Sequence, residues 1–230
     1  MLSLSNIALA SILAIAEVGS AQTTIGFGPH FSLGPVSASS WIRESFTTLV
    51  LPAIPSPRAD RLALWPGMGT SGGDLIQALA VSFDNPNANC GARVGQWCTW
   101  ASTLKGTQLG GRQVPANPGD QLTIHYQFND RTGKYDQSVA LNGVIVSTLS
   151  TSDGHAQGWG TAVECQEKAC KSYVPAHRYL STKIILDSAD PAFGKTLVLN
   201  EARTSGLTTT DGGKTWTVAT IDIGAHTFNI

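Results

Sequence analysis

Apolar and polar side chains alternate along most of the chain, which is the pattern of half-buried β-strands. The segment 121–128 (QLTIHYQF) shows it most clearly: four apolar side chains lie on one face, and Thr123, His125 and Gln127 lie on the other. Beyond the first 21 residues, no stretch shows the 3.6-residue period of an amphipathic helix convincingly. The pattern therefore predicts an all-β protein.

A two-residue turn supports this prediction. Asn142-Gly143 separates the alternating segments Ser138–Leu141 and Val144–Ser147, and a type I′ hairpin turn needs positive φ at both central positions. Clusters of Gly, Pro, Asn and Asp separate further predicted strands, which are Phe46–Leu51, Leu62–Trp65, Asp74–Phe83, Gly160–Cys165, Thr182–Asp187, Lys195–Asn200 and Thr217–Ile223. About ten strands with regular turn signals predict an antiparallel β-sandwich.

The first residues carry a different signal. The apolar segment Ile7–Ala16 precedes small residues at Gly19 and Ala21, which fits a signal peptide of residues 1–21 cleaved after Ala21. A buried core helix is the alternative. Excluding this segment leaves one domain over residues 22–230, in which residues 22–45 are expected to form an irregular N-terminal arm. The protein is then expected to be secreted and extracellular.

Charge narrows the range of partners. The 209 residues after the predicted signal peptide hold 15 basic and 15 acidic side chains, so their formal charge is zero. No basic stripe is present that could follow a phosphate backbone or an anionic membrane surface. Neither nucleic acid nor a membrane is therefore an expected partner, and we expect a monomer.

Four cysteines remain in the predicted mature chain: Cys90, Cys98, Cys165 and Cys170. An even number in a secreted chain favours disulfides, and three pairings are possible. Cys90–Cys98 and Cys165–Cys170 are favoured because each closes a short local loop. A zinc site is the competing interpretation, but neither spacing matches a common zinc motif and no histidine is near either pair. We expect no metal.

The segment 209–216 (TTDGGKTW) fits the Asp-box pattern that caps hairpins in β-propellers. A propeller would repeat the pattern in every blade, and here it occurs once. We interpret it as a turn in which Asp211 accepts backbone N–H bonds and Trp216 packs beneath.

Two polar residues stand out from their strands. Gln77 lies among apolar side chains on one face of Asp74–Phe83, where an amide needs a hydrogen-bond partner or a function. Glu164 shares its face of the segment 159–165 (WGTAVEC) with Gly160 and Ala162, whose small size leaves room above the sheet. Gln77 is interpreted either as a core glutamine bonded to the backbone or as an amide held rigidly at the floor of a cleft. Glu164 is interpreted either as a structural ion-pair partner or as a catalytic acid/base.

Five segments together resemble a known family, the eqolisins, which are the fungal glutamic peptidases. They occur in the family's order and approximate spacing, and they are ALWPG (63–67), LIQALAV (75–81), PGDQLTI (118–124), AVEC (162–165) and NEARTSG (200–206). The resemblance implies a concanavalin A-like β-sandwich, or jelly roll, and a catalytic dyad of Gln77 and Glu164. It also implies that Trp65 lines the substrate cleft and that no cofactor is needed.

The leading hypothesis is therefore a secreted acid endopeptidase that acts on polypeptides. Glu164 would be the general base, and Gln77 would stabilise the oxyanion. Trp65, Trp97 and Trp159 are the candidate substrate-binding residues. Two alternatives stay open. One is a non-catalytic carbohydrate-binding sandwich in which Trp97, Trp100 and Trp159 stack on sugar rings, and the other is a polysaccharide-active enzyme on the same scaffold.

Overall fold

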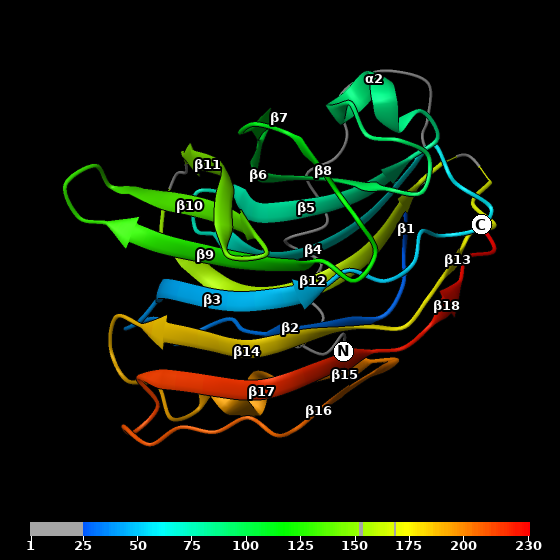
Figure 1. Cartoon of the computed structure of the whole chain (residues 1–230). Helices are drawn as coiled ribbons and strands as arrows, with labels where there is room; N and C mark the ends of the chain where they lie inside the picture. The colour runs from blue at the N-terminus through cyan, green and yellow to red at the C-terminus, as the bar shows by residue number, and fades with distance from the viewer. Residues whose placement is uncertain (1–24, 152–153, 168) are drawn as a thin grey trace.

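The alternating segments form two antiparallel sheets stacked face to face (Figure 1). The computed structural model describes residues 25–151, 154–167 and 169–230. The sheet that faces away from the candidate site is called the back sheet, and the other the front sheet; these names do not refer to the view in Figure 1. The back sheet runs in the order β11 (Val144–Ser150), β10 (Lys134–Leu141), β9 (Gln121–Asn129), β3 (Ile42–Val50), β14 (His177–Leu186), β17 (Thr215–Ile223) and β16 (Ala202–Thr204).

The front sheet carries the candidate site. Its central strands run in the order β12 (Ala156–Gln166), β4 (Arg61–Thr70), β5 (Leu75–Phe83), β6 (Trp97–Lys105) and β7 (Thr107–Gly110). On the far side of β12 lie β1 (Ile25–Phe27) and β2 (His30–Leu33), while β8 (Val114–Ala116) pairs with β6 and β15 (Val198–Asn200) pairs with β2. The two sheets meet at one paired position, Ala156 opposite Ile42.

Short elements complete the described chain. A five-residue helix, α2 (Pro86–Cys90), follows β5, and a 3₁₀ turn, η2 (Phe193–Thr196), precedes β15. The strands β13 (Tyr173–Val174) and β18 (His226–Thr227) form a small separate ladder. Among the described residues, no helix has the length and apolar character needed to span a membrane.

The core lies between the two sheets, and the front sheet is covered on its other face as well. All nine positions of β5 are buried. Its even-numbered residues join the inter-sheet core, whereas Leu79 and Phe83 belong to a second apolar cluster with Trp65 and Trp100 on the outer face. The outer face of the front sheet is therefore apolar and covered rather than a solvated surface.

The sequence pattern predicted the main strands correctly, and the all-β antiparallel sandwich is confirmed. Asn142 and Gly143 have φ values of 50° and 86°, as the predicted turn requires. Two expectations are corrected. The arm 22–45 is not irregular where it is described, because β1 and β2 pair with β12, and the segment 195–200 begins in a 3₁₀ turn. The predicted signal peptide lies outside the described residues.

Both favoured disulfides are present, Cys90–Cys98 and Cys165–Cys170. The first joins the end of α2 to β6, and the second holds the chain where it leaves β12. Each cross-link limits the freedom of the unfolded chain, which is the usual source of disulfide stabilisation. Both also fix loops that flank strands of the front sheet.

The turn at 209–216 has the predicted geometry. Asp211 Oδ1 accepts hydrogen bonds from the backbone N–H groups of Thr215 (2.8 Å) and Lys214 (3.1 Å) and from the hydroxyl of Thr209 (3.0 Å). Trp216 is buried below, and its Nε1 donates to the carbonyl of Gly213. The bonds to Thr215 are the main cause that lowers the pKa of Asp211 to about 2.

Replacement of this carboxylate should reduce stability in a pH-dependent way. Because the folded-state pKa is depressed, the carboxylate stabilises the fold above pH 3.8 and loses that effect as pH falls through 2. We expect Asp211→Ala to lower the melting temperature at pH 5–7, with a difference from the parent chain that narrows towards pH 2. Thermal unfolding followed across this pH range checks it, and a constant difference would contradict it.

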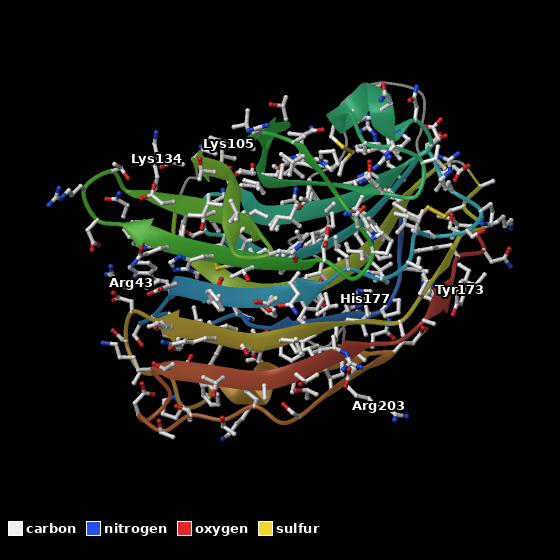
Figure 2. The ribbon with its side chains drawn as sticks, in the orientation of Figure 1. Arg43, Lys105, Lys134, Tyr173, His177 and Arg203 are labelled. Carbon is white, nitrogen blue, oxygen red and sulfur yellow. A yellow bond between two sulfur atoms is a disulfide. The ribbon has the colours of Figure 1, made fainter. Side chains whose placement is uncertain are left out.

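A buried histidine also weakens the fold in acid, but at a higher pH. His177 begins β14 at the end of the strand away from Arg43 (Figure 2), and its Nε2 has no hydrogen-bond partner within the described chain. Burial lowers its pKa to about 4, although a bond to the carbonyl of Pro175 partly offsets the shift. The imidazole is therefore neutral in the folded protein at neutral pH.

Acid should weaken the fold through this residue. The unfolded chain takes up the proton near pH 6.5 and the folded chain only near pH 4, so stability falls as pH drops through that window, by about 3 kcal/mol at its lower end. His177→Gln removes the titrating group. We expect its free energy of unfolding, measured with denaturant, to fall less between pH 7 and pH 4 than that of the parent chain; parallel curves would exclude this role.

Candidate active site

A cavity of about 400 Å³ lies over the outer face of the front sheet. Its floor comes from β4, β5, β6 and β12, and one wall comes from β1. Most lining side chains are apolar, and the lining consists of Ile25, Phe27, Arg61, Ala63, Trp65, Leu75, Gln77, Leu79, Val81, Phe83, Asn89, Trp100, Leu104, Gln108, Gln113, Glu164 and Gln166. Among these described residues only Arg61 and Glu164 are charged.

Gln77 presents an unpartnered amide to this cavity. Its side chain is 4% exposed and makes no hydrogen bond within the described residues. Across the sheet it faces Gly67 on β4, which in turn faces Gly160 on β12. The room expected above Gly160 is filled, because a Cβ there would lie 3.0 Å from the carbonyl oxygen of Phe31.

Glu164 is held by two neutral donors. Trp65 Nε1 donates to its Oε2 at 2.8 Å, and Gln166 Nε2 donates to its Oε1 at 2.5 Å. All three side chains lie on the cavity face of adjacent strands, because Glu164 and Gln166 are two residues apart on β12. The carboxylate is half-buried, and the two bonds fix the direction in which its oxygens point.

The register of the sheet relates these groups. Glu164 is opposite Ala63 and Gln77 is opposite Gly67, so Trp65 lies between them on the same face of β4. The indole needs the glycine: a Cβ on Gly67 would lie 3.2 Å from Trp65 Cε3 and 2.9 Å from the carbonyl oxygen of Ile76. Gln77 and Glu164 therefore line one cavity diagonally across Trp65.

A buried amide supports Gln77 from below. Gln137 on β10 is buried in the inter-sheet core, close to β5 and β6. In the amide orientation that satisfies its neighbours, its nitrogen donates to the carbonyls of Ser102 (2.9 Å) and Gln77 (3.2 Å), and its oxygen accepts from the hydroxyl of Thr103. The back sheet thereby fixes the backbone of the residue whose side chain enters the cavity.

The predicted site residues are divided between two places. Gln77, Glu164 and Trp65 line the same cavity. Trp97 and Trp159, also expected to bind substrate, are instead buried in the inter-sheet core, where Trp97 Nε1 donates to the carbonyl of Pro52 and Trp159 packs edge-on against Phe31. Neither can contact a molecule in this cavity, and the expectation for them is corrected.

Several lining residues were not predicted from the sequence. Gln166 could have been found, because it follows Glu164 by two positions on one strand. Trp100 was proposed only for sugar stacking, yet it lies on the cavity floor, three residues from Trp97 and on the other face. Arg61 and Phe27 carried no local signal, since their place depends on how β4 and β1 pair with β12.

One wall of the cavity is held in place by the other end of the chain. Phe27 of β1 pairs with Glu164 on β12. Gly26 is packed so closely by Phe228 and Ile230 that a Cβ there would lie 3.3 Å from Phe228 Cδ1 and would overlap Ile230. Phe228 and Ile230 thus pack behind the strand that carries Phe27 into the site.

The arrangement of possible metal ligands does not point to a metal centre. Within the described chain, the grouping found is Cys165, Glu167 and Cys170, and its two sulfurs are already bonded to each other. A disulfide sulfur is not the thiolate that a metal ion needs. The cavity itself offers amides, one carboxylate and one guanidinium.

Comparison with known proteins finds no family that matches the chain and no match among curated proteins. Among solved structures, the chain is similar to scytalido-glutamic peptidase in complex with a peptide-based transition-state analogue, with a TM-score of 0.53 and 10% identity over 86% of this chain and 99% of that one. It is also similar to SCP-B, an eqolisin peptidase in complex with the tripeptide Ala-Ile-His, with a TM-score of 0.50 and 9% identity over the same shares. At these identities the likeness establishes a shared fold.

The support beneath Gln77 can be tested without any assay of activity. Gln137→Met removes a buried amide and leaves two carbonyls without their donor, which should cost about 1–3 kcal/mol of unfolding free energy. Gln127→Met, on the exposed face of β9, is the matched control and should stay within about 0.5 kcal/mol of the parent. Equal effects in denaturant titrations would show that Gln137 does not hold the sheet.

Proposed function

We propose that the chain is an acid endopeptidase of the glutamic type, in which Gln77 and Glu164 act on a water molecule and a peptide bond. The observation that carries this proposal is that an amide and a carboxylate line the same cavity. A buried amide with no partner and a single oriented carboxylate share an apolar pocket of about 400 Å³. Unpaired buried amides are costly, so a ligand group that accepts its hydrogen bond is expected.

The chemistry balances with these two groups alone. The Glu164 carboxylate takes a proton from water as the water oxygen bonds to the carbonyl carbon. The resulting oxyanion accepts a hydrogen bond from the Gln77 amide, which is strong because the apolar walls exclude water. The proton then passes from Glu164 to the amide nitrogen and the C–N bond breaks. A carboxylic acid and an amine leave, and Glu164 is again ionised.

The neighbours of the dyad fit these roles. The bonds from Trp65 and Gln166 orient Glu164 before a substrate arrives, which is the preorganisation that electrostatic catalysis needs. The fold shared with two peptidases supports the same assignment.

A polysaccharide-cleaving role finds less support in the cavity. Glycosidases commonly use two carboxyl groups, one on each side of the scissile bond. Among the described residues that line the cavity, Glu164 is the only acid. Sugar stacking is also disfavoured, because Trp65 and Trp100 are 3% and 5% exposed and present little open ring surface.

We also infer that the protein acts outside the cell. Two disulfides persist in oxidising compartments, and the predicted signal peptide would direct the chain there. Expression with and without residues 1–21 checks the inference: only the longer chain should appear in the culture medium with both disulfides formed.

The decisive experiment is hydrolysis of denatured protein at pH 3–5 by the full chain, expressed in a secreting host. We expect Glu164→Gln to lower kcat/KM by about 10²–10⁴, the range for a general base, and Gln77→Ala by about 10²–10³. Glu44→Gln is the matched control, since Glu44 is half-buried and hydrogen-bonded to His125 on the back sheet, away from the cavity. Its activity should be unchanged.

Two outcomes would reject the proposal. One is turnover that survives Glu164→Gln in a correctly folded protein, as judged by circular dichroism and melting temperature. The other is absence of proteolysis by the parent chain together with cleavage or tight binding of glycans, which would favour a carbohydrate-directed function.

A further inference from the structure

A single guanidinium lies at one end of the cavity. Arg61 is the first residue of β4, and it pairs with Gln166 on β12 and with Phe83 on β5. Its guanidinium carbon is 5.9 Å from the ring centroid of Phe83, within cation–π range. The side chain is exposed to the cavity mouth, yet the aromatic ring limits where it can lie.

Arg43 binds Asp130 and Asp187, and Arg178 binds Asp222, but this guanidinium has no counter-ion among the described residues. Within the described residues, Arg61 makes neither an ion pair nor a hydrogen bond. A planar five-donor group beside apolar walls is well suited to a carboxylate, which it can bind through two parallel N–H···O bonds.

The register gives the distance from this cation to the reacting centre. Arg61 and Ala63 lie on the same face of β4, and alternate residues of a strand are about 6.8 Å apart. Ala63 pairs with Glu164, so Arg61 is one such step beyond the carboxylate. An extended peptide advances about 3.4 Å per residue, so two residues cover the step.

We propose that Arg61 determines specificity by binding a carboxylate of the substrate about two residues from the scissile bond. The inference rests on the proposed peptidase function. The carboxylate is either an acidic side chain of the peptide or its C-terminal group, since both offer the same two oxygens. Apolar side chains such as Phe27 and Phe83 line the path between, so the intervening residues are expected to be apolar.

Peptide pairs test this inference. The full chain is assayed at pH 5, where most carboxyl groups of Glu and of chain termini are ionised. In one arm, Glu replaces Gln at each of three positions on both sides of an apolar cleavage site. In the other arm, the same peptide ends in a carboxylate or in an amide. We expect kcat/KM to be at least tenfold higher for the peptide that carries a carboxylate at one of these positions than for its neutral counterpart. The difference should come mainly from a lower KM.

Three variants isolate the role of the guanidinium. Arg61→Gln should abolish the preference, and Arg61→Glu should reverse it in favour of a peptide with Lys at that position. Arg131→Gln, an exposed arginine in the turn after β9, is the matched control and should keep the preference. Whichever arm shows the effect identifies the source of the carboxylate.

Failure of the Arg61 inference can be distinguished from failure of the peptidase proposal. Cleavage by the parent chain without a carboxylate preference, or a preference that survives Arg61→Gln, overturns the inference and leaves the peptidase proposal intact. If no peptide is cleaved, the peptidase proposal fails, and calorimetric binding of the same acid and amide peptides decides the role of Arg61. Tenfold tighter binding of the acid form that Arg61→Gln removes supports it; equal binding overturns it.

Discussion

The alternation of side chains across a doubly covered sheet is the constraint on which the rest of this structure depends. On β4, β5 and β12, every second residue anchors in the inter-sheet core and the others form the floor of the cavity. Because the core side chains fix the register, they also fix which residues enter the site. A slip of one residue in any of these strands would remove Gln77, Trp65 or Glu164 from the cavity.

The same constraint explains what could be predicted from the sequence. The two-residue period is local, so it identified Gln77 as a polar residue in an apolar face and Glu164 as a carboxylate among small neighbours. The same period implied that Trp97 and Trp159 face the core, since Trp159 is an odd number of positions from Glu164 and so lies on the opposite face. The expectation that these rings stack on a ligand was therefore at odds with the period. The wall formed by β1 depends on pairing between segments more than 130 residues apart, and no local pattern reports such pairing.

The chemistry of this cavity depends on how few charged groups line it. Among many apolar side chains, the half-buried carboxylate of Glu164 is screened less than the exposed guanidinium of Arg61. The donors on Glu164 are neutral, so they orient it without supplying a competing cation. Acid conditions then act on the fold at two points, because the buried ring of His177 takes up a proton near pH 4, whereas the bonded carboxylate of Asp211 keeps its charge down to about pH 2.

The contact between Gly26 and the side chains of Phe228 and Ile230 has a practical consequence. It places Phe228 and Ile230 against the strand that carries Phe27 beside Glu164. An affinity tag or fusion partner attached directly after Ile230 would begin next to that strand. Recombinant protein intended for kinetic work is therefore better tagged through a long flexible linker, or at an internal surface loop such as the hairpin at Asn142-Gly143.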